Sequence, residues 1–526
     1  MIRHDNSSER RGYTRRSFVK GCAVAGLGAA ATGLAACAPA ASGSDGDAGR
    51  ATDGAESEQK SFDVVETKEC DVCVVGAGAS GLAAAVQAAQ DGARVLCLES
   101  QKIAGGNING VEGCFGIGSS MQKERGIDID PGATIRSELA ASQMRASGPG
   151  YVDMVHNSGE NIDWLVENGV TFGGVDVDKG TLEVFHRFAS GRGQADYAEP
   201  MAAKAEELGV EFVFETAAHT LIKGETDAIE GLYADSPDGT IQVNAKAVIV
   251  ATGGFAQNDE LMAGVALNKH LTYGGFEGHD GSGHLMCVDA GAHSYRDRTS
   301  LLVAFDIEGT PGYYDGGLFA FVLGVAAPYA VWVNQNGERY ANEDCAGENA
   351  MLMCMPALAQ EDAFCVLDSA MMDQYGNGNS ELYDQIDRGI EHGSIFKADT
   401  IESLAQAAGL PADTFAATIG EYNGFAADGS DRNYGKAPAT LMPVQQAPFY
   451  ALRISSGLNS TIGSIYTDRS FHALDGDMQP IDGLYVVGTE GAMLWSNLYT
   501  INVSGGCNAN NVNSGRTAAK DAVAKL

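Results

Sequence analysis

Three glycines in a G-x-G-x-x-G spacing form the part of this 526-residue chain whose residue types best fit a chemical role. Gly76, Gly78 and Gly81 follow an apolar stretch, and a later apolar stretch ends at Glu99. Gly76 permits a tight turn, Gly78 lets a pyrophosphate approach the backbone, and Gly81 lets a helix pack on a strand. The helix N-terminus attracts phosphates, and the terminal acid accepts hydrogen bonds from ribose hydroxyls. The spacing predicts a dinucleotide-binding βαβ unit; the alternative is a Gly-rich turn in an unrelated α/β protein.

The segments that must position this unit have the pattern of a buried parallel sheet. Residues 247–251 are apolar and lead into Thr252, Gly253 and Gly254, and residues 483–488 repeat this pattern near the C-terminus. Parallel strands that are buried on both faces show such continuous apolar runs. Further elements are predicted as a helix over 198–208, a strand over 210–215, an antiparallel excursion over 231–243 and a last helix from Gly506 to Val523. The pattern indicates an α/β fold.

The sequence pattern changes over residues 299–459, and this change indicates an inserted cap domain. Its segments are mixed, and amphipathic helices are predicted over 401–408 and 412–425. Active sites in folds of this kind lie between domains, where closure excludes water. We therefore expect a dinucleotide-binding domain made of residues 66–298 and 460–526, with the cap over its site.

The N-terminal residues have the features of an export signal. Arg15-Arg16-Ser17-Phe18-Val19-Lys20 precedes a short apolar stretch rich in Gly and Ala, so residues 1–36 are predicted to be a twin-arginine signal peptide. Leu34-Ala35-Ala36-Cys37 resembles a lipoprotein processing site, which would attach the protein to a membrane surface through Cys37; cleavage after Ala40 is the alternative. Residues 37–65 are predicted to be a flexible tether. The protein is expected to be exported to the cell surface.

Composition limits the classes of function. The formal net charge is −35, and an acidic chain of this kind disfavours nucleic acid as a partner. The 11 cysteines are scattered, with no C-x-x-C-H for an attached haem and no tight group of four for zinc or iron–sulfur. We expect no metal site and mostly buried free thiols. His186, His279 and His284 fit ordinary loop positions as well as site positions.

Several separated motifs in the right order identify a family. Over about residues 66–526 the chain resembles the flavoprotein subunits of the fumarate reductase/succinate dehydrogenase family. The matching segments are 75–81, Glu99, 105–107, 251–255, 280–281, 333–334, 337–343, 400–404, 422–425, 448–452, 483–485 and 515–516. The resemblance implies a Rossmann-like FAD-binding domain of the GR2 type with an inserted α+β cap.

The resemblance also implies which residues hold FAD. By position these are Gly76, Gly78, Ala79 and Gly81 for the pyrophosphate, Glu99 and Ser100 for the adenosine ribose, Gly106, Asn107, Gly113 and Cys114 on the path to the flavin, Ala218 at the adenine, Thr252, Gly253 and Asp280 beside the cofactor, Thr489 or Glu490 at the ribityl chain, and Cys507 and Asn508 at the flavin ring. The last two begin the final helix, whose N-terminus favours negative charge on the flavin.

The chain departs from the family at the positions that bind a dicarboxylate. The arginine proton donor of family members that act on fumarate corresponds to Gly347, and the substrate-binding histidine corresponds to Ser460. Residues 499–505 lack the arginine of the family's C-terminal N-R-x-G-G motif. Residues 323–329 lack the acid and the base of its T-E-x-x-R motif. Because buried carboxylates need cationic partners, fumarate, succinate and aspartate are poor candidate substrates.

A neutral acceptor conjugated to a carbonyl or lactone fits such a site better. Tyr499 is the first candidate for the proton donor, with the backbone N–H of Gly505 nearby, as in the Tyr/Gly pair of 3-ketosteroid dehydrogenases. The alternative is that Tyr499 only packs beside the flavin. Glu348 is a weaker candidate acid, and Arg339 is expected to hold structure.

The sequence analysis therefore predicts an exported FAD-dependent reductase of a C=C bond in a small molecule that is not a dicarboxylate. Two alternatives stay open: a ketosteroid-like FAD dehydrogenase, and a flavin-bearing surface lipoprotein without turnover. No haem or covalent-flavin domain is recognised in the chain. We expect a separate electron donor, either a multihaem cytochrome c or a flavin carrier, and a place at the end of an anaerobic respiratory chain.

Overall fold

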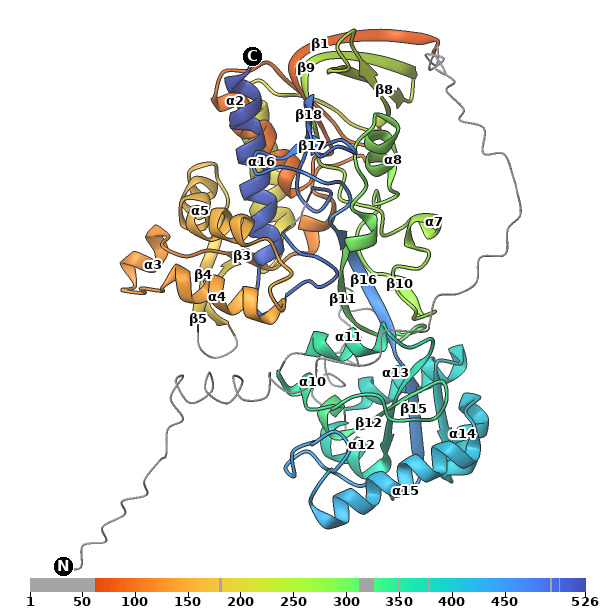
Figure 1. Ribbon diagram of the computed structural model, residues 1–526. Coiled ribbons are helices and arrows are strands. Elements are labelled where there is room, and N and C mark those ends of the chain that lie inside the picture. Colours follow the sequence, from red (N-terminus) through yellow and green to blue (C-terminus); the bar gives the residue numbers. More distant parts are fainter. Residues whose placement is uncertain are drawn as a thin grey trace, which may run out of the picture. The chain divides into compact units, whose positions relative to one another are not determined.

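Strand β1 (Val64–Val75) lies at the centre of the main sheet and carries the glycine turn at its end (Figure 1). Its parallel neighbours are β2 (Val95–Leu98) and β9 (Gly239–Val250). Pairing continues in parallel to β6 (Glu211–Val213) and β18 (Pro480–Val486), and then antiparallel to β17 (His472–Leu474) at one edge. Strands β7 (Ala217–Lys223) and β8 (Ile229–Ser236) extend β9 as an antiparallel excursion. The predicted α/β class with a parallel sheet is confirmed.

The computed structural model describes residues 62–178, 182–311, 326–348, 350–376, 379–491, 494–500 and 502–526. The predicted signal peptide, Cys37 and most of the predicted tether lie outside these ranges, so export and lipid attachment stay predictions. The chain from Phe62 to Leu526 forms one compact unit. Within the described part, no helix combines the length and apolar character that crossing a membrane requires.

Two helices cover the face of the sheet beside the glycine turn. Helix α2 (Ala79–Gln90) begins at the turn, and α16 (Gly506–Ala524) lies beside it, so that segments from opposite ends of the chain share one core (Figure 1). A Cβ atom at Gly515 would lie 2.3 Å from the carbonyl oxygen of Ser80, which is why the two helices approach so closely only with glycine at this position. The Arg516 Nε donates to Gln87 Oε1 at 2.9 Å and joins them further.

A second, antiparallel sheet was not expected from the sequence. It contains β3 (Gly113–Phe115), β5 (Leu182–Phe188) and β4 (Phe172–Asp178) in that order. Helices α4 (Pro131–Ala141) and α5 (Gly148–Glu167) share an apolar cluster with it and with the segment before α16. The other α-helices before the predicted cap are α3 (Ser120–Glu124), α6 (Glu199–Glu207), α7 (Asp259–Met262) and α8 (Ser282–Asp289).

The predicted cap is an antiparallel sheet covered by helices. Its strands are β12 (Val331–Asn334), β13 (Ala363–Asp368), β15 (Phe449–Arg453) and β14 (Ile395–Ala398) in that order. Its helices are α10 (Cys345–Glu348), α11 (Cys354–Ala357), α12 (Ser369–Gly376), α13 (Ser380–His392), α14 (Ile401–Ala408) and α15 (Ala412–Asp428). Strand β16 (Ser455–Ile462), paired with β10 (Leu271–Tyr273) and β11 (Ser300–Asp306), runs through the predicted boundary at residue 459.

A buried ion pair stabilises the cap. The Arg339 guanidinium donates to both carboxylate oxygens of Glu343, at 2.7 and 2.6 Å, and to Asp431 Oδ2 at 2.8 Å. All three side chains are at most 7% exposed. Arg339 therefore has the structural role expected for it, because its buried guanidinium is paired with two carboxylates and does not line the cavity described below.

The described cysteines are free thiols. They number nine, and seven of them are buried. Within the ranges given above, no group of three or more His, Cys, Asp or Glu side chains is placed to hold a metal ion.

Candidate active site

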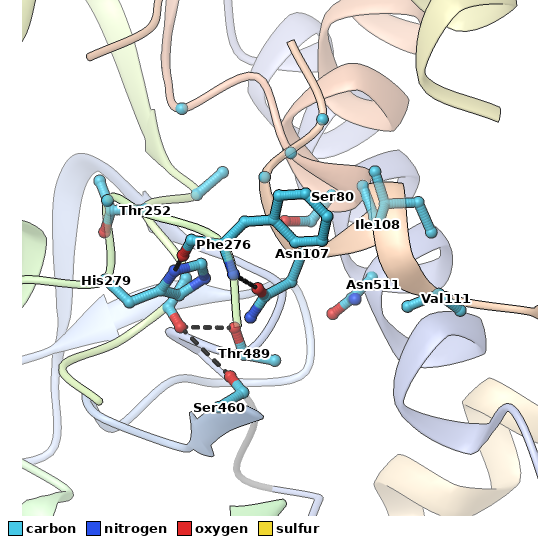
Figure 2. Close-up of a pocket in the computed structure, with 18 of the residues that line it drawn as sticks. Ser80, Asn107, Ile108, Val111, Thr252, Phe276, His279, Ser460, Thr489 and Asn511 are labelled. Atoms are coloured by element: carbon cyan, nitrogen blue, oxygen red, sulfur yellow. Dashed lines mark hydrogen bonds between the residues drawn. The ribbon is translucent and has the colours of Figure 1, made fainter. Parts of the chain in front are cut away.

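A cavity of about 500 Å³ runs from the glycine turn to the N-terminus of α16 (Figure 2). The ends of β1, β2 and β9, the start of α2 and the loop after β10 form its walls. Of the predicted site residues, those that line it are Gly76, Gly78, Ala79, Glu99, Ser100, Gly106, Asn107, Gly113, Ala218, Thr252, Gly253, Asp280, Thr489, Tyr499, Gly505, Cys507 and Asn508. Parallel strands deliver residues from distant parts of the chain to one edge of a sheet, which is the usual place for such a site.

Two of the three glycines of the turn, Gly76 and Gly81, have no room for a side chain. Gly76 has a φ of 99°, and a Cβ there would lie 2.7 Å from the carbonyl oxygen of Ala251. A Cβ at Gly81 would lie 1.8 Å from the carbonyl oxygen of Gly76. Gly81 therefore acts behind the cavity wall, by letting α2 sit against the turn, and does not line the cavity itself.

Glu99 joins the end of β2 to the turn. Its side chain is 9% exposed; Oε2 accepts from Ala77 N at 2.7 Å and Oε1 accepts from Gln101 N at 2.8 Å. Burial raises the pKa of Glu99, and the backbone hydrogen bonds oppose this effect. The carboxylate is thus held in place at the cavity wall, next to Ser100.

Asn107 connects three segments that are far apart in sequence. Its Oδ1 accepts from Phe276 N at 2.7 Å (Figure 2). Its Nδ2 donates to the carbonyl oxygen of Asn459 at 2.7 Å. The amide therefore fixes the loop after β10 and strand β16 against the turn that contains Gly106. Cys114 lies in β3, 2% exposed, and does not line the cavity.

The two candidates for the ribityl position lie differently. Thr489 lines the cavity, and its hydroxyl donates to the carbonyl oxygen of Gly253 at 2.9 Å (Figure 2). Glu490 is fully buried and does not line the cavity. Its Oε2 accepts from Thr252 Oγ1 and from Gly254 N, both at 2.7 Å. Glu490 therefore shapes the turn after β9 from behind.

His279, which the sequence left open between a loop position and a site position, lines the cavity. Its Nδ1 lies 2.9 Å from the carbonyl oxygen of Phe276 and 2.8 Å from the Tyr273 hydroxyl. Because a carbonyl oxygen only accepts, Nδ1 carries the proton and Nε2 is left as an acceptor. Burial lowers the pKa of His279, which keeps the ring neutral. The one available signal was its place beside Asp280 in a family motif.

The other two histidines lie away from the cavity. His186 is fully buried, with Nε2 2.7 Å from Ser119 Oγ, and His284 contacts Ser464 Oγ at 3.0 Å. Neither side chain lines the cavity. Both are core histidines with local hydrogen-bond partners.

Tyr499 lies at the end of the cavity beside α16. Its ring is 5% exposed and packs edge-on against Trp495, with ring centroids 4.8 Å apart. Its hydroxyl oxygen accepts a hydrogen bond from Cys507 N at 3.2 Å. Gly505, the N-cap of α16, has a φ of 78° and packs so closely on β3 that a Cβ would lie 2.5 Å from Phe115 N. The phenol and the helix terminus thus form one wall.

The positions that differ from the family lie as follows. Ser460 lines the cavity, and its hydroxyl donates to the carbonyl oxygen of Thr461 at 3.0 Å. Gly347 and Glu348 belong to α10 in the cap, and the side chain of Glu348 lies outside what the structure describes. Among the described lining residues there is no arginine and no lysine.

The residues present fit FAD. The turn at Gly76 and Gly78 leaves its backbone open to a pyrophosphate at the N-terminus of α2. At the other end, the buried Oδ1 atoms of Asn508 and Asn511 on α16 have no hydrogen-bond partner within the protein, and both residues line the cavity. Unpaired buried amide oxygens indicate a polar ligand at this end.

Comparison with known proteins agrees with this fit. The family described as FAD binding domain matches residues 71–499. A vinyl phenol reductase of Lactiplantibacillus plantarum is 31% identical over 461 residues, covering 83% of this chain and 93% of that protein. A urocanate reductase of Eggerthella lenta is 24% identical, covering 77% of this chain and 66% of that protein.

Solved structures share the fold. An open conformation of a flavocytochrome c3 fumarate reductase superposes with a TM-score of 0.64 at 22% identity, covering 88% of this chain and 79% of that chain. A 3-ketosteroid-delta4-(5alpha)-dehydrogenase from Rhodococcus jostii superposes with a TM-score of 0.66 at 24% identity. The match covers 89% of this chain and 99% of that chain. The chain therefore belongs to the FAD-binding family of fumarate reductase flavoproteins, and it is an FAD-dependent oxidoreductase that acts on CH–CH groups.

Proposed function

We propose that this protein reduces a carbon–carbon double bond in an uncharged, conjugated small molecule. The observation that carries this proposal is the absence of arginine and lysine among the described residues that line the cavity. Residues 312–325, which the structure does not describe, contain no arginine or lysine in their sequence either. A dicarboxylate bound here would lose its water without gaining a cation, at a cost of several kcal/mol, which is on the order of the penalty for a buried unpaired charge.

The apolar side chains at the end of the cavity beside α16 support this substrate class. Phe185, Leu302, Tyr499 and Val503 line that end. They suit a planar or aromatic group better than a small diacid. The similarity to a vinyl phenol reductase points in the same direction, because a vinyl phenol is an uncharged aromatic compound with a conjugated double bond.

Tyr499 is the proposed proton donor. FAD, when bound and reduced by the electron donor proposed below, would supply the hydride for reduction of the double bond. Because Cys507 N–H donates to the Tyr499 oxygen, the phenolic proton is directed away from the helix terminus. Burial raises the pKa of Tyr499 well above its ordinary value, so the residue keeps its proton at neutral pH. The protein thus places one neutral donor in a wall that holds no competing cation.

The remaining parts of the proposal concern the physiological setting. We propose export by the twin-arginine route, with a lipid anchor at Cys37, and an anaerobic respiratory role as a terminal reductase. The electron donor is a separate protein, either a multihaem cytochrome c or a flavin carrier. Relatives named fumarate reductase (cytochrome) support a haem-bearing donor.

An anaerobic assay with chemically reduced viologen tests the reaction class. We expect a vinyl phenol or a cyclic enone to oxidise the viologen at least tenfold faster than fumarate does at equal concentration. Rapid turnover of fumarate would contradict the proposal. Reduction of an artificial acceptor by saturated ketones would instead support a ketosteroid-like dehydrogenase. Silence across the panel with redox-competent FAD would support a binding protein without turnover.

A further inference from the structure

A buried hydrogen-bond network lies directly behind Tyr499 and involves a carboxylate that the proposed reaction does not use. Glu138 on α4 is 1% exposed. Its Oε2 accepts from Thr500 Oγ1 at 2.7 Å and from the Tyr151 hydroxyl at 3.1 Å. Trp495 Nε1 donates to the Tyr151 hydroxyl at 2.7 Å and lies 3.2 Å from Thr500 Oγ1. The four side chains form one closed polar cluster inside an apolar core.

This cluster fixes the two chain positions that determine where the phenol lies. Thr500 is the next residue after Tyr499, and Trp495 supplies the ring surface on which Tyr499 packs. Tyr151 on α5 connects the same carboxylate to the Trp495 indole. Movement of Thr500 or Trp495 would therefore displace the Tyr499 hydroxyl from Cys507 N.

A carboxylate is costly at this depth, and apolar residues would fill the space more cheaply. Because Glu138 Oε2 accepts from two hydroxyl groups at once, it holds Thr500 and Tyr151 in a fixed geometry. Such a device is useful where a reacting group must lie within a fraction of an ångström of its place.

We propose that Glu138 is the positioning residue for Tyr499, acting through Thr500 and Trp495. The inference rests on the proposed function, in which Tyr499 is the proton donor. Glu138 itself contacts neither the substrate nor the cofactor, since it is not among the residues that line the cavity. Its loss is expected to lower the rate of proton transfer and to leave the binding of FAD and substrate intact.

The test compares Thr500→Val with Thr500→Ser in the full-length protein loaded with FAD. Valine keeps the shape but removes the donor to Glu138, whereas serine keeps the donor. We expect Thr500→Val to lower kcat about tenfold, with KM and FAD content unchanged within twofold, because misplacement of a catalytic group costs on the order of one to two powers of ten in rate. Thr500→Ser should restore most of kcat. Glu138→Leu removes the acceptor itself and should resemble Thr500→Val.

Ser158→Ala is the matched control. Ser158 lies on α5, is 1% exposed, and its hydroxyl bonds Ile117 N at 2.9 Å and the carbonyl oxygen of Val155 at 2.7 Å. Neither of these hydrogen bonds reaches the segment around Tyr499, so this variant should lower stability to urea as Thr500→Val does and leave kcat unchanged. Wild-type kcat in Thr500→Val, together with a strong loss in Tyr499→Phe, would overturn the positioning role alone. Wild-type kcat in Tyr499→Phe would instead overturn the donor role and with it this inference.

Discussion

The backbone N–H of Cys507 donates to the hydroxyl of Tyr499 at 3.2 Å, so the first turn of α16 is directed at a phenol of the same chain. The family resemblance places this helix start at the flavin ring. In the structure, one of its N–H groups orients the candidate donor instead. The helix end thus contributes to the position of Tyr499 as well as to the field at the end of the cavity.

Substitution of Tyr499 by phenylalanine tests the donor role. The change removes the hydroxyl and keeps the ring on Trp495, so we expect kcat to fall between about 100- and 10,000-fold, the usual contribution of a general acid. FAD absorbance and the melting temperature should change little. Tyr233→Phe on β8, outside the cavity lining, is the control and should keep wild-type activity.

Substitution of Gly81 by alanine tests the close approach of α2 to the turn. The added Cβ would lie 1.8 Å from the carbonyl oxygen of Gly76, so the turn must open. We expect loss of bound FAD, measured by its absorbance after gel filtration. Gly420→Ala in α15 is the control, because no atom lies within 4 Å of its added Cβ. That variant should keep FAD and gain up to about 1 kcal/mol of stability. Equal FAD content in both variants would contradict the assignment.

The pH dependence of stability tests the burial of His186. Burial lowers its pKa to about 4 in the folded protein, whereas an unfolded histidine titrates near pH 6.5. Between these values the unfolded chain binds a proton that the folded chain does not, so stability falls as the pH falls from about 6.5 to 4. The loss is about 3 kcal/mol at the low end. Urea unfolding of His186→Gln should show a flatter profile over this range; parallel profiles would contradict the prediction.

Loss of Arg339 tests the buried ion pair of the cap. Arg339→Leu removes the guanidinium that joins the buried Glu343 and Asp431, and it leaves Glu343 with Lys436 Nζ, 3.5 Å away, as its charged partner. The loss should cost about 3–5 kcal/mol of unfolding free energy. Arg432→Leu removes an exposed arginine, 68% accessible, that pairs with Asp428, and should cost less than about 1 kcal/mol. Denaturant titrations of both variants check the difference. Similar midpoints for the two would show that the buried pair contributes no more than the exposed one.

The sequence by itself determined the parts of this protein that depend on local pattern. A glycine spacing between apolar strands predicts a turn because only glycine fits the backbone of Gly76 and the contact at Gly81. Continuous apolar runs predict buried parallel strands, and helix α14 has the predicted bounds. Family motifs then identified FAD, since such motifs preserve the turns that hold a cofactor.

Tertiary structure alone decided which side chains face the cavity. Thr489 and Glu490 are neighbours in sequence, yet the first lines the cavity and the second is buried behind it with Thr252 and Gly254 as partners. The position of His279 and the network around Glu138 depend equally on distant residues; Glu138 and Thr500 are 362 positions apart. Local pattern reports burial and turns, but the direction of a side chain is set by long-range partners that the sequence does not place side by side.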